Sequence, residues 1–326
     1  MDIRSIKMEA NARLRQANQS PRKIFFIHTA IWAGVSLVLA LVSYILDNTV
    51  SSGGGLRGMD TQVALSTAQT VLQLISTVAL PFWSAGLIYV ALDYSRSQQV
   101  RTSDLAEGFR RFKPVLSSSL MMGLQYVARG IVSVYLTSML VMVTPFAAPA
   151  YKLMQLQEEN PQLDLFSANV EGIAGFYVAT IVIFALVFGA LALPVFYRYR
   201  MVNYIIMDEQ QIGGLRALLL SRVMMHRRRW KLLQLDLSFW WYYGLKLLLI
   251  LLSVTHLLLK LINISADISA DTVYWISQIV AVAGSLALNT YCKPVVETGY
   301  ALCYQQFRQQ PEPEPVRQPK SHPWTY

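Results

Sequence analysis

Charged residues are rare inside the long apolar runs of this sequence, and three of those found there could carry chemistry. They are Arg129, Lys246 and Glu297. Burying a charge in the hydrocarbon of a bilayer costs at least about 2.5–3.5 kcal/mol on insertion scales, so such residues usually mark an ion pair or a functional site. Lys246 and Glu297 lie at similar depths in successive runs. We therefore predict that they pair, either as a structural ion pair or as part of a proton or ion relay.

Each of these charges also has a purely structural interpretation. Lys246 is close enough to one end of its run to extend its ammonium group to the lipid headgroups, which would leave Glu297 neutral in a polar gap. Arg129 lies near the middle of its run, so we expect it to face the helix bundle or a water-filled cleft. Contact with a substrate there is an alternative to a structural role. Asp236 lies across the same predicted membrane border as Lys246 and completes a candidate intramembrane polar site.

Motifs of enzymatic chemistry are missing from the sequence. It contains no GxSxG, P-loop, GxGxxG or HExxH pattern. Histidine occurs only at His28, His226, His256 and His322, and no two of these have the spacing of metal ligands. The sequence therefore predicts no catalytic residue, no metal and no cofactor, although a membrane enzyme assembled only in three dimensions stays possible.

A basic segment, Tyr197–Trp241, separates two of the apolar runs; we call it the elbow. Its candidate lipid-contacting residues are Arg222, Arg227, Arg228, Arg229 and Lys231. A basic residue beside an anionic leaflet contributes about 1 kcal/mol of attraction. Binding of nucleic acid would need a soluble domain, which the sequence does not offer. The elbow predicts membrane lipids as partners, through anionic headgroups at the cytosolic face, and no nucleic acid.

The elements that must position these residues are long apolar helices. The 326 residues are 54% hydrophobic and 14% charged, against about 25% charged in average soluble domains. Runs of about 20 apolar residues are long enough to cross a bilayer as helices. The sequence predicts an all-α membrane protein with six transmembrane helices, at about residues 24–46, 63–92, 115–146, 173–196, 239–262 and 272–304.

The orientation of these spans follows from their flanking charges. Of the 28 lysines and arginines, 22 fall on one predicted side of the membrane, two on the other and four within spans. Lysine and arginine accumulate in cytoplasmic loops. This distribution predicts that both termini lie in the cytosol.

Segments outside the spans, and the prolines within them, complete the predicted architecture. Residues 1–23 are predicted to hold an amphipathic cytosolic helix, the elbow a second cytosolic helix, and residues 305–326 a disordered, proline-rich cytosolic tail. Each even-numbered span carries a proline followed by aromatic residues, at Pro81, Pro194 and Pro294. This pattern is consistent with three related helical hairpins, although prolines are also simply tolerated in membrane helices.

The elbow and the N-terminus also carry a resemblance to a known family. The relevant residues are the N-terminal Ile3, Arg4, Ile6, Lys7, Ala10, Leu14 and Asn18, and then Tyr197, Tyr199, Met201, Tyr204, Ile205, Ala217, Ser221, Leu235, Leu237, Ser238, Phe239, Trp241, Pro294 and Tyr304. The chain resembles a family of uncharacterised bacterial six-span membrane proteins, classed as a domain of unknown function. That family is distantly similar to the membrane domain of some glycerophosphodiester phosphodiesterases. The resemblance implies a fold and a bacterial inner-membrane location, but no activity.

Two functions are therefore open from the sequence. The first is a non-enzymatic integral membrane protein of the bacterial inner membrane, acting in membrane homeostasis or as a scaffold. The second is a transporter or lipid-handling permease with a polar cleft near Arg129, Lys246 and Glu297. A polar cleft at Arg129 would favour transport, and a tightly packed bundle would favour the scaffold.

Overall fold

The computed structural model describes residues 2–52, 56–145, 147–159, 173–253 and 270–309. These residues form helices and no strand, which confirms the all-helical prediction. Of the predicted disordered tail, residues 305–309 instead belong to a helix that ends at Gln309, and residues 310–326 lie outside the described residues. The end of the fifth predicted span also lies outside them.

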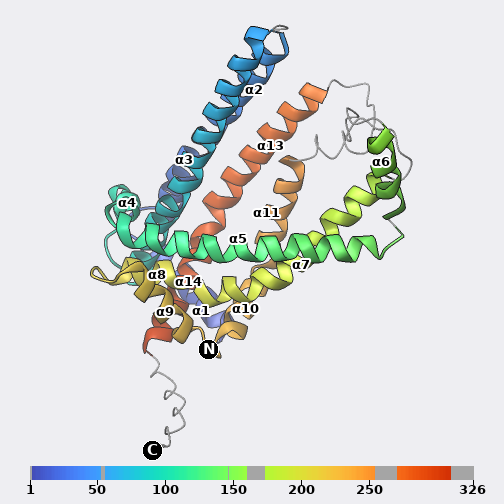
Figure 1. Cartoon of the computed structure of the whole chain (residues 1–326). Coiled ribbons are helices and arrows are strands. Elements are labelled where there is room, and N and C mark those ends of the chain that lie inside the picture. Colours follow the sequence, from blue (N-terminus) through green and yellow to red (C-terminus); the bar gives the residue numbers. More distant parts are fainter. Residues whose placement is uncertain (1, 53–55, 146, 160–172, 254–269, 310–326) are drawn as a thin grey trace, which may run out of the picture. The chain divides into compact units, whose positions relative to one another are not determined.

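The helices follow one another along the chain (Figure 1). They are α1 (Ile3–Arg15), α2 (Pro21–Ser52), α3 (Leu56–Ser95), the 3-10 helix η1 (Thr102–Ala106), α4 (Glu107–Arg110), α5 (Phe112–Met142), α6 (Ala147–Glu159), α7 (Ile173–Tyr199), α8 (Val202–Asp208), α9 (Gly214–Met224), α10 (Arg229–Ser238), α11 (Trp240–Ser253), α13 (Ala270–Tyr291) and α14 (Lys293–Gln309).

Contacts between Cα atoms divide the chain into two compact units. Unit 1 comprises Met1–Leu116, Arg200–Trp240 and Leu286–Tyr326, and unit 2 comprises Ser117–Tyr199 and Trp241–Ser285. Each unit is described by itself below.

Four described segments are long and apolar enough to cross a membrane as single helices. They are Pro21–Leu39, Gln73–Ser95, Phe112–Met142 and Gly175–Asp208. Two further pairs qualify only if each bent pair is one span: α10 with α11, bent by 70°, and α13 with α14, bent by 47°. The described residues therefore contain four to six candidate spans, where the sequence predicted six.

The three prolines of the predicted hairpins act differently in the structure. Pro81 lies inside α3 and Pro194 inside α7, and neither helix is interrupted. Pro294 stands in the first turn of α14, directly after the bend that follows α13. A proline in a first turn removes no helical hydrogen bond. The predicted last span is thus two helices, of which the second begins at the proline.

The elbow also differs from the prediction of a single cytosolic helix. It contains three short helices, α8, α9 and α10, and Arg227 between the last two has a φ of 65°. A left-handed conformation of this kind cannot continue a right-handed helix. The arginine run therefore lies at a break between helices, and hydrophobic periodicity alone gives no sign of that break.

The predicted N-terminal amphipathic helix is present as α1. Its N-cap residue Asp2 accepts a hydrogen bond from the Arg4 backbone amide at 3.0 Å, which satisfies one of the free donors at the helix start. Ile6 and Ala10, four residues apart and so on one face, are fully buried. This helix packs against α14 and α3 within unit 1.

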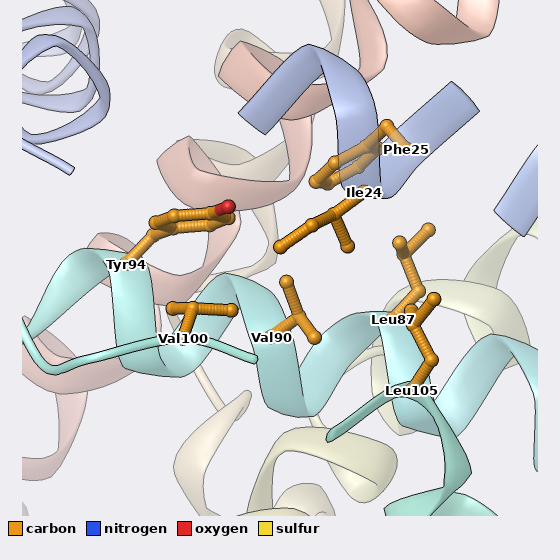
Figure 2. Packing of buried hydrophobic residues seen from close by; sticks show 7 residues of the cluster. All are labelled: Ile24, Phe25, Leu87, Val90, Tyr94, Val100 and Leu105. Atoms are coloured by element: carbon orange, nitrogen blue, oxygen red, sulfur yellow. The ribbon is translucent and has the colours of Figure 1, made fainter. Parts of the chain in front are cut away.

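A hydrophobic cluster joins the first span to the end of the second (Figure 2). Ile24 and Phe25 of α2 meet Leu87, Val90 and Tyr94 of α3, together with Val100 and Leu105 of the segment that follows. Burying one such side chain stabilises the fold by roughly 1.5–3 kcal/mol. The core of unit 1 therefore gathers around the C-terminal end of α3.

Two glycines bring η1 and α4 into backbone contact with α3. A Cβ atom at Gly86 would lie 1.9 Å from the Leu105 carbonyl oxygen, and one at Gly108 would lie 2.0 Å from the Phe82 carbonyl oxygen. Real Cβ atoms do not approach backbone this closely, so only glycine fits at either position. The segment after α3 is thus folded back tightly onto that helix.

Several glycines of unit 2 lie in open space, as Gly34 of unit 1 also does. A Cβ atom at Gly123, Gly130 or Gly189 would meet nothing within 4 Å, and one at Gly284 would meet only the Leu249 side chain. Many of its large apolar side chains are exposed, including Tyr135, Met139 and Leu186. Such surfaces are expected where lipid is the solvent.

Candidate functional site

Asp208, the last residue of α8, contacts side chains from several distant segments of unit 1. Its side chain is only 4% exposed, and it forms ion pairs with Arg96, just after α3, and with Arg308 of α14. The Tyr304 hydroxyl donates to Asp208 Oδ2 at 2.9 Å. One carboxylate therefore joins three segments that lie far apart in the sequence.

A second carboxylate, Glu297, extends this arrangement into α14. The Tyr204 hydroxyl donates to Glu297 Oε2 at 3.0 Å, and the Tyr204 and Tyr304 rings stack with centroids 5.9 Å apart. Glu297, Tyr204, Tyr304 and Asp208 thus form a continuous chain of contacts between α8 and α14. We call these four residues, with Arg96 and Arg308, the carboxylate–tyrosine hub.

Chemically, the hub has the character of a fixed structural network. Removing one partner of a buried ion pair typically costs 3–5 kcal/mol, because the other charge is left uncompensated. The carboxylate of Asp208 is held by two guanidinium groups and a hydroxyl. In the described residues no three side chains of the His, Cys, Asp or Glu type are grouped so that they could hold a metal ion.

Arg111 joins the α4 segment to the same region. Its guanidinium donates to the Ile206 carbonyl oxygen in α8 and lies 3.5 Å from Glu107 Oε1. It also lies over the Tyr89 ring, 5.7 Å from the centroid. This buried arginine therefore holds α3, α4 and α8 together.

The amphipathic α1 is fastened to the elbow by Lys7. The Lys7 ammonium donates to the Ser238 carbonyl oxygen at the end of α10 and lies 4.3 Å from the Phe239 ring centroid. Desolvation lowers the pKa of Lys7 below its ordinary value of 10.5. Lys7 therefore connects α1 to the C-terminal end of α10 within unit 1.

A groove with a volume of about 340 Å³ opens between α2 and α3 of unit 1. Trp32 and Val35 line it from α2, Ala79 and Trp83 from α3, and Phe109 from α4. The remaining lining residues are aliphatic apart from one serine. Its walls are therefore almost entirely apolar.

The lining residue Trp83 is fixed by a reciprocal pair of hydrogen bonds with His28. The Trp83 indole N–H donates to the His28 carbonyl oxygen at 3.1 Å, and His28 Nε2 lies 3.2 Å from the Trp83 carbonyl oxygen. Their rings stack at 5.1 Å. Because the indole N–H is already bonded to backbone, Trp83 offers the groove only an apolar ring.

The residues predicted for an intramembrane polar site fall into both units. In unit 2, Arg129 donates to the Gln125 carbonyl oxygen of its own helix at 2.7 Å, and Lys246 lies exposed on α11. In unit 1, Glu297 accepts from Tyr204, and Asp236 is half-buried in α10. The predicted pair of Lys246 with Glu297 stays a prediction, because its members belong to separate units.

The elbow residues predicted to contact lipid have different surroundings. Arg222, Arg227 and Lys231 are exposed, and Arg229 is half-buried at the start of α10. Arg228 donates to the Phe307 carbonyl oxygen at 2.7 Å and lies over the Phe307 ring. Arg228 therefore fastens the elbow to α14, whereas contact with lipid stays a prediction for all five.

Asp208, Arg96 and Arg308 were not identified from the sequence as site residues. A signal was present, because Tyr89 and Tyr204 are each followed four residues later by aspartate, at Asp93 and Asp208. The corresponding position after Tyr300 is Tyr304, the residue that donates to Asp208. An alignment of these tyrosines places Asp93, Asp208 and Tyr304 at one position, and two of these three residues belong to the hub.

Comparison with known proteins gives a family and no activity. No curated protein and no solved structure matches the chain. The family described as "Protein of unknown function (DUF975)" matches residues 1–310, so the chain belongs to that family.

Proposed function

We propose that this chain is a multi-span membrane protein that binds a membrane lipid by its acyl chain, without chemistry of its own. The observation that carries the proposal is the apolar groove between α2 and α3. Its lining belongs largely to two segments, Pro21–Leu39 and Gln73–Ser95, that are apolar and long enough to cross a bilayer. At that depth, acyl chains are the molecules available to fill an apolar groove.

The size and lining of the groove support a lipid over a polar substrate. Its volume of about 340 Å³ lies near the lower end of the roughly 300–1,000 Å³ usual for small-molecule sites. A charged or strongly hydrated solute would lose its hydration there without new partners. None of the predicted polar residues Arg129, Lys246, Asp236 or Glu297 lines the groove.

Membrane placement forms part of the proposal. We propose six spans, with the two bent helix pairs each crossing once, and both termini in the cytosol, as the distribution of lysine and arginine supports. The bacterial inner membrane is the proposed location, on the resemblance described above. Likeness to the membrane domain of glycerophosphodiester phosphodiesterases would fit a lipid-related role.

A scaffold is the second candidate, and the carboxylate–tyrosine hub favours it. The hub joins the end of α3 to α8 and α14 through Asp208. A fixed base of this kind would suit a protein that holds other proteins in the membrane. It is equally useful to lipid binding, because it keeps α3, one wall of the groove, in place.

Crosslinking of a lipid in the groove tests the proposal. The purified chain would be placed in bilayers containing phosphatidylcholine with a diazirine on its acyl chain, and the labelled peptides would be mapped by mass spectrometry. We expect labels on the groove faces of α2 and α3. Ala79→Trp fills the groove and should reduce labelling there at least fivefold.

Leu80→Trp is the matched control. Leu80 neighbours Ala79 on α3, is 45% exposed and does not line the groove, so its replacement should leave the groove label unchanged. Equal labelling of the wild type and Ala79→Trp would reject lipid binding in this groove. Absence of the label, together with a stoichiometric protein crosslinked to unit 1, would favour the scaffold.

A further inference from the structure

We infer that the groove selects an anionic phospholipid, whose phosphate is bound by Arg110 and Lys113 while one acyl chain occupies the groove. This inference rests on the proposed function. Its basis is the joint between α4 and α5, defined here as residues 107–113, which supplies Phe109 to the groove wall and carries three basic residues.

The joint is held in a fixed position against α3. Gly108 lies against the Phe82 carbonyl oxygen so closely that no Cβ atom fits. The Phe82 ring stacks on Phe112 at 4.8 Å and packs against Phe109 at 5.7 Å. These contacts fix the backbone of the joint, and with it the direction in which each basic side chain leaves it.

The three basic residues of the joint point to different environments. The Arg111 side chain is 11% exposed, and its guanidinium contacts Glu107 and the Ile206 carbonyl oxygen. The Arg110 side chain is 72% exposed, and Lys113 is also exposed. Arg111 therefore binds groups inside unit 1, whereas Arg110 and Lys113 are exposed in the same segment that supplies Phe109 to the groove.

Two aromatic side chains accompany the outward cations. Phe109 and Phe112 are 44% and 48% exposed. Phenylalanine rings next to lysine and arginine suit the membrane interface, where the rings enter the acyl boundary and the cations meet the headgroups. The predicted orientation places this joint on the cytosolic side, where anionic lipids give the leaflet its negative surface potential.

The local balance of charge is positive. Glu107 lies 3.1 Å from Arg110 and 3.5 Å from Arg111, so a single carboxylate is shared by two guanidinium groups. Lys113 has no acidic partner among the described residues. Two further carboxylates lie outside residues 107–113: Asp104 accepts from the Arg101 amide and the Ser103 hydroxyl, and Asp93 is buried. An anionic headgroup would therefore meet a net positive joint.

Selectivity is measured with two crosslinking lipids that share the same diazirine-bearing acyl chain. One carries a phosphatidylglycerol headgroup and the other phosphatidylcholine, each at the same low mole fraction in neutral bilayers. Since each basic residue contributes roughly a fivefold preference, we expect the wild type to label at least fivefold more with phosphatidylglycerol. The preference should fall as salt is raised, because salt screens exposed charges.

Paired substitutions distinguish recognition of the lipid headgroup from binding of the acyl chain. R110Q/K113Q should bring the ratio of the two lipids close to one while phosphatidylcholine still labels the groove. R110K/K113R keeps both charges and should keep the preference. Arg101→Gln is the matched control, because it removes an exposed charge from the same loop and should leave the ratio unchanged.

The outcomes distinguish this inference from the proposed function. If R110Q/K113Q retains the wild-type preference, selection by the joint is rejected while lipid binding in the groove stands. If neither lipid labels the groove in the wild type, lipid binding itself fails. If a second copy of the chain or another protein occupies the groove, crosslinks from the groove residues will join protein to protein, and the inference is overturned.

Discussion

The two units differ in how many of their tyrosines are buried. In unit 1, Tyr94, Tyr204, Tyr300 and Tyr304 are almost wholly buried, as in the core of a soluble protein. In unit 2, Tyr135 and Met139 are each 70% exposed. Tyrosine is amphipathic, so its burial needs both apolar contact and a partner for the hydroxyl. Unit 1 supplies both from within its own fold.

The side-chain hydrogen bonds described below also differ between the two units. In unit 1 the hub connects side chains of distant segments, as in the contact of Tyr304 with Asp208. In unit 2 many of the described side-chain hydrogen bonds return to the same helix, such as Ser133 to the Arg129 carbonyl oxygen and Thr180 to the Phe176 carbonyl oxygen. Unit 1 therefore contains the tertiary pairs of the hub, whereas these hydrogen bonds of unit 2 lie within single helices.

The largest expected effect of a single substitution is at Asp208. Asp208→Ala removes the acceptor of two guanidinium groups and a buried hydroxyl, and we expect unit 1 to be destabilised by about 3 kcal/mol. This is the low end of the range for buried pairs, because Arg96 and Arg308 are partly exposed. The buried thiol of Cys303 reports the opening of unit 1, and its maleimide labelling should accelerate roughly a hundredfold.

Glu209→Gln is the control for this measurement. Glu209 follows Asp208, is 41% exposed and pairs with Arg308 at 3.4 Å. Exposed pairs of this kind contribute roughly 0–1 kcal/mol. A Cys292→Ser background restricts the label to Cys303. Equal labelling rates in Asp208→Ala and Glu209→Gln would show that the hub does not stabilise unit 1.

Next in size is the effect of adding a methyl group to a glycine. Gly108→Ala forces a Cβ atom against the Phe82 carbonyl oxygen, and overpacking of this kind costs about 1–3 kcal/mol. Gly130→Ala in unit 2 meets open space and should stabilise its helix by up to about 1 kcal/mol. Thermal unfolding in detergent should show shifts of opposite sign. Destabilisation by both substitutions would mean that Gly130 is as tightly packed as Gly108, and stabilisation by both would mean that neither site is tightly packed.

The sequence predicted well those features that depend on local pattern. Ile6 and Ala10 are spaced for one helical face, and α1 is present with that face buried. Apolar runs likewise predicted the long helices. Periodicity says little about where a helix bends, and so the break at Arg227 and the bend before Pro294 were not foreseen.

The candidate sites were harder to predict, because their members are distant in the sequence. Asp208 is separated from Arg96 and from Arg308 by about 100 positions of sequence. In the sequence alone, each of these residues resembles an ordinary charged residue of a loop or a helix end. The three charges singled out from the sequence were chosen for their cost in lipid. That criterion finds isolated charges and overlooks those that the fold itself compensates.

The elbow offers a smaller test of how far unit 1 depends on its arginines. Arg228→Gln loses the hydrogen bond to the Phe307 carbonyl oxygen and should cost about 1 kcal/mol. Arg227→Gly relieves a positive φ and should be neutral or stabilising by up to about 1 kcal/mol. The Cys303 labelling rate should rise for the first substitution and stay level or fall for the second. A lower Cys303 labelling rate in Arg228→Gln than in Arg227→Gly would contradict the conclusion that Arg228 holds the elbow against α14.

The smallest expected effects concern Glu297, and they bear on a link between the two units. A double-mutant cycle with Tyr204→Phe and Glu297→Gln should give a coupling of about 1 kcal/mol, because their hydrogen bond lies within unit 1. A second cycle with Lys246→Gln and Glu297→Gln tests the predicted ion pair. If the pair forms, this cycle also gives a coupling, and the exchange K246E/E297K recovers the stability lost in either single charge reversal. A second coupling near zero with no recovery would leave Glu297 as part of the hub alone, and Lys246 as a lysine that extends to the headgroups.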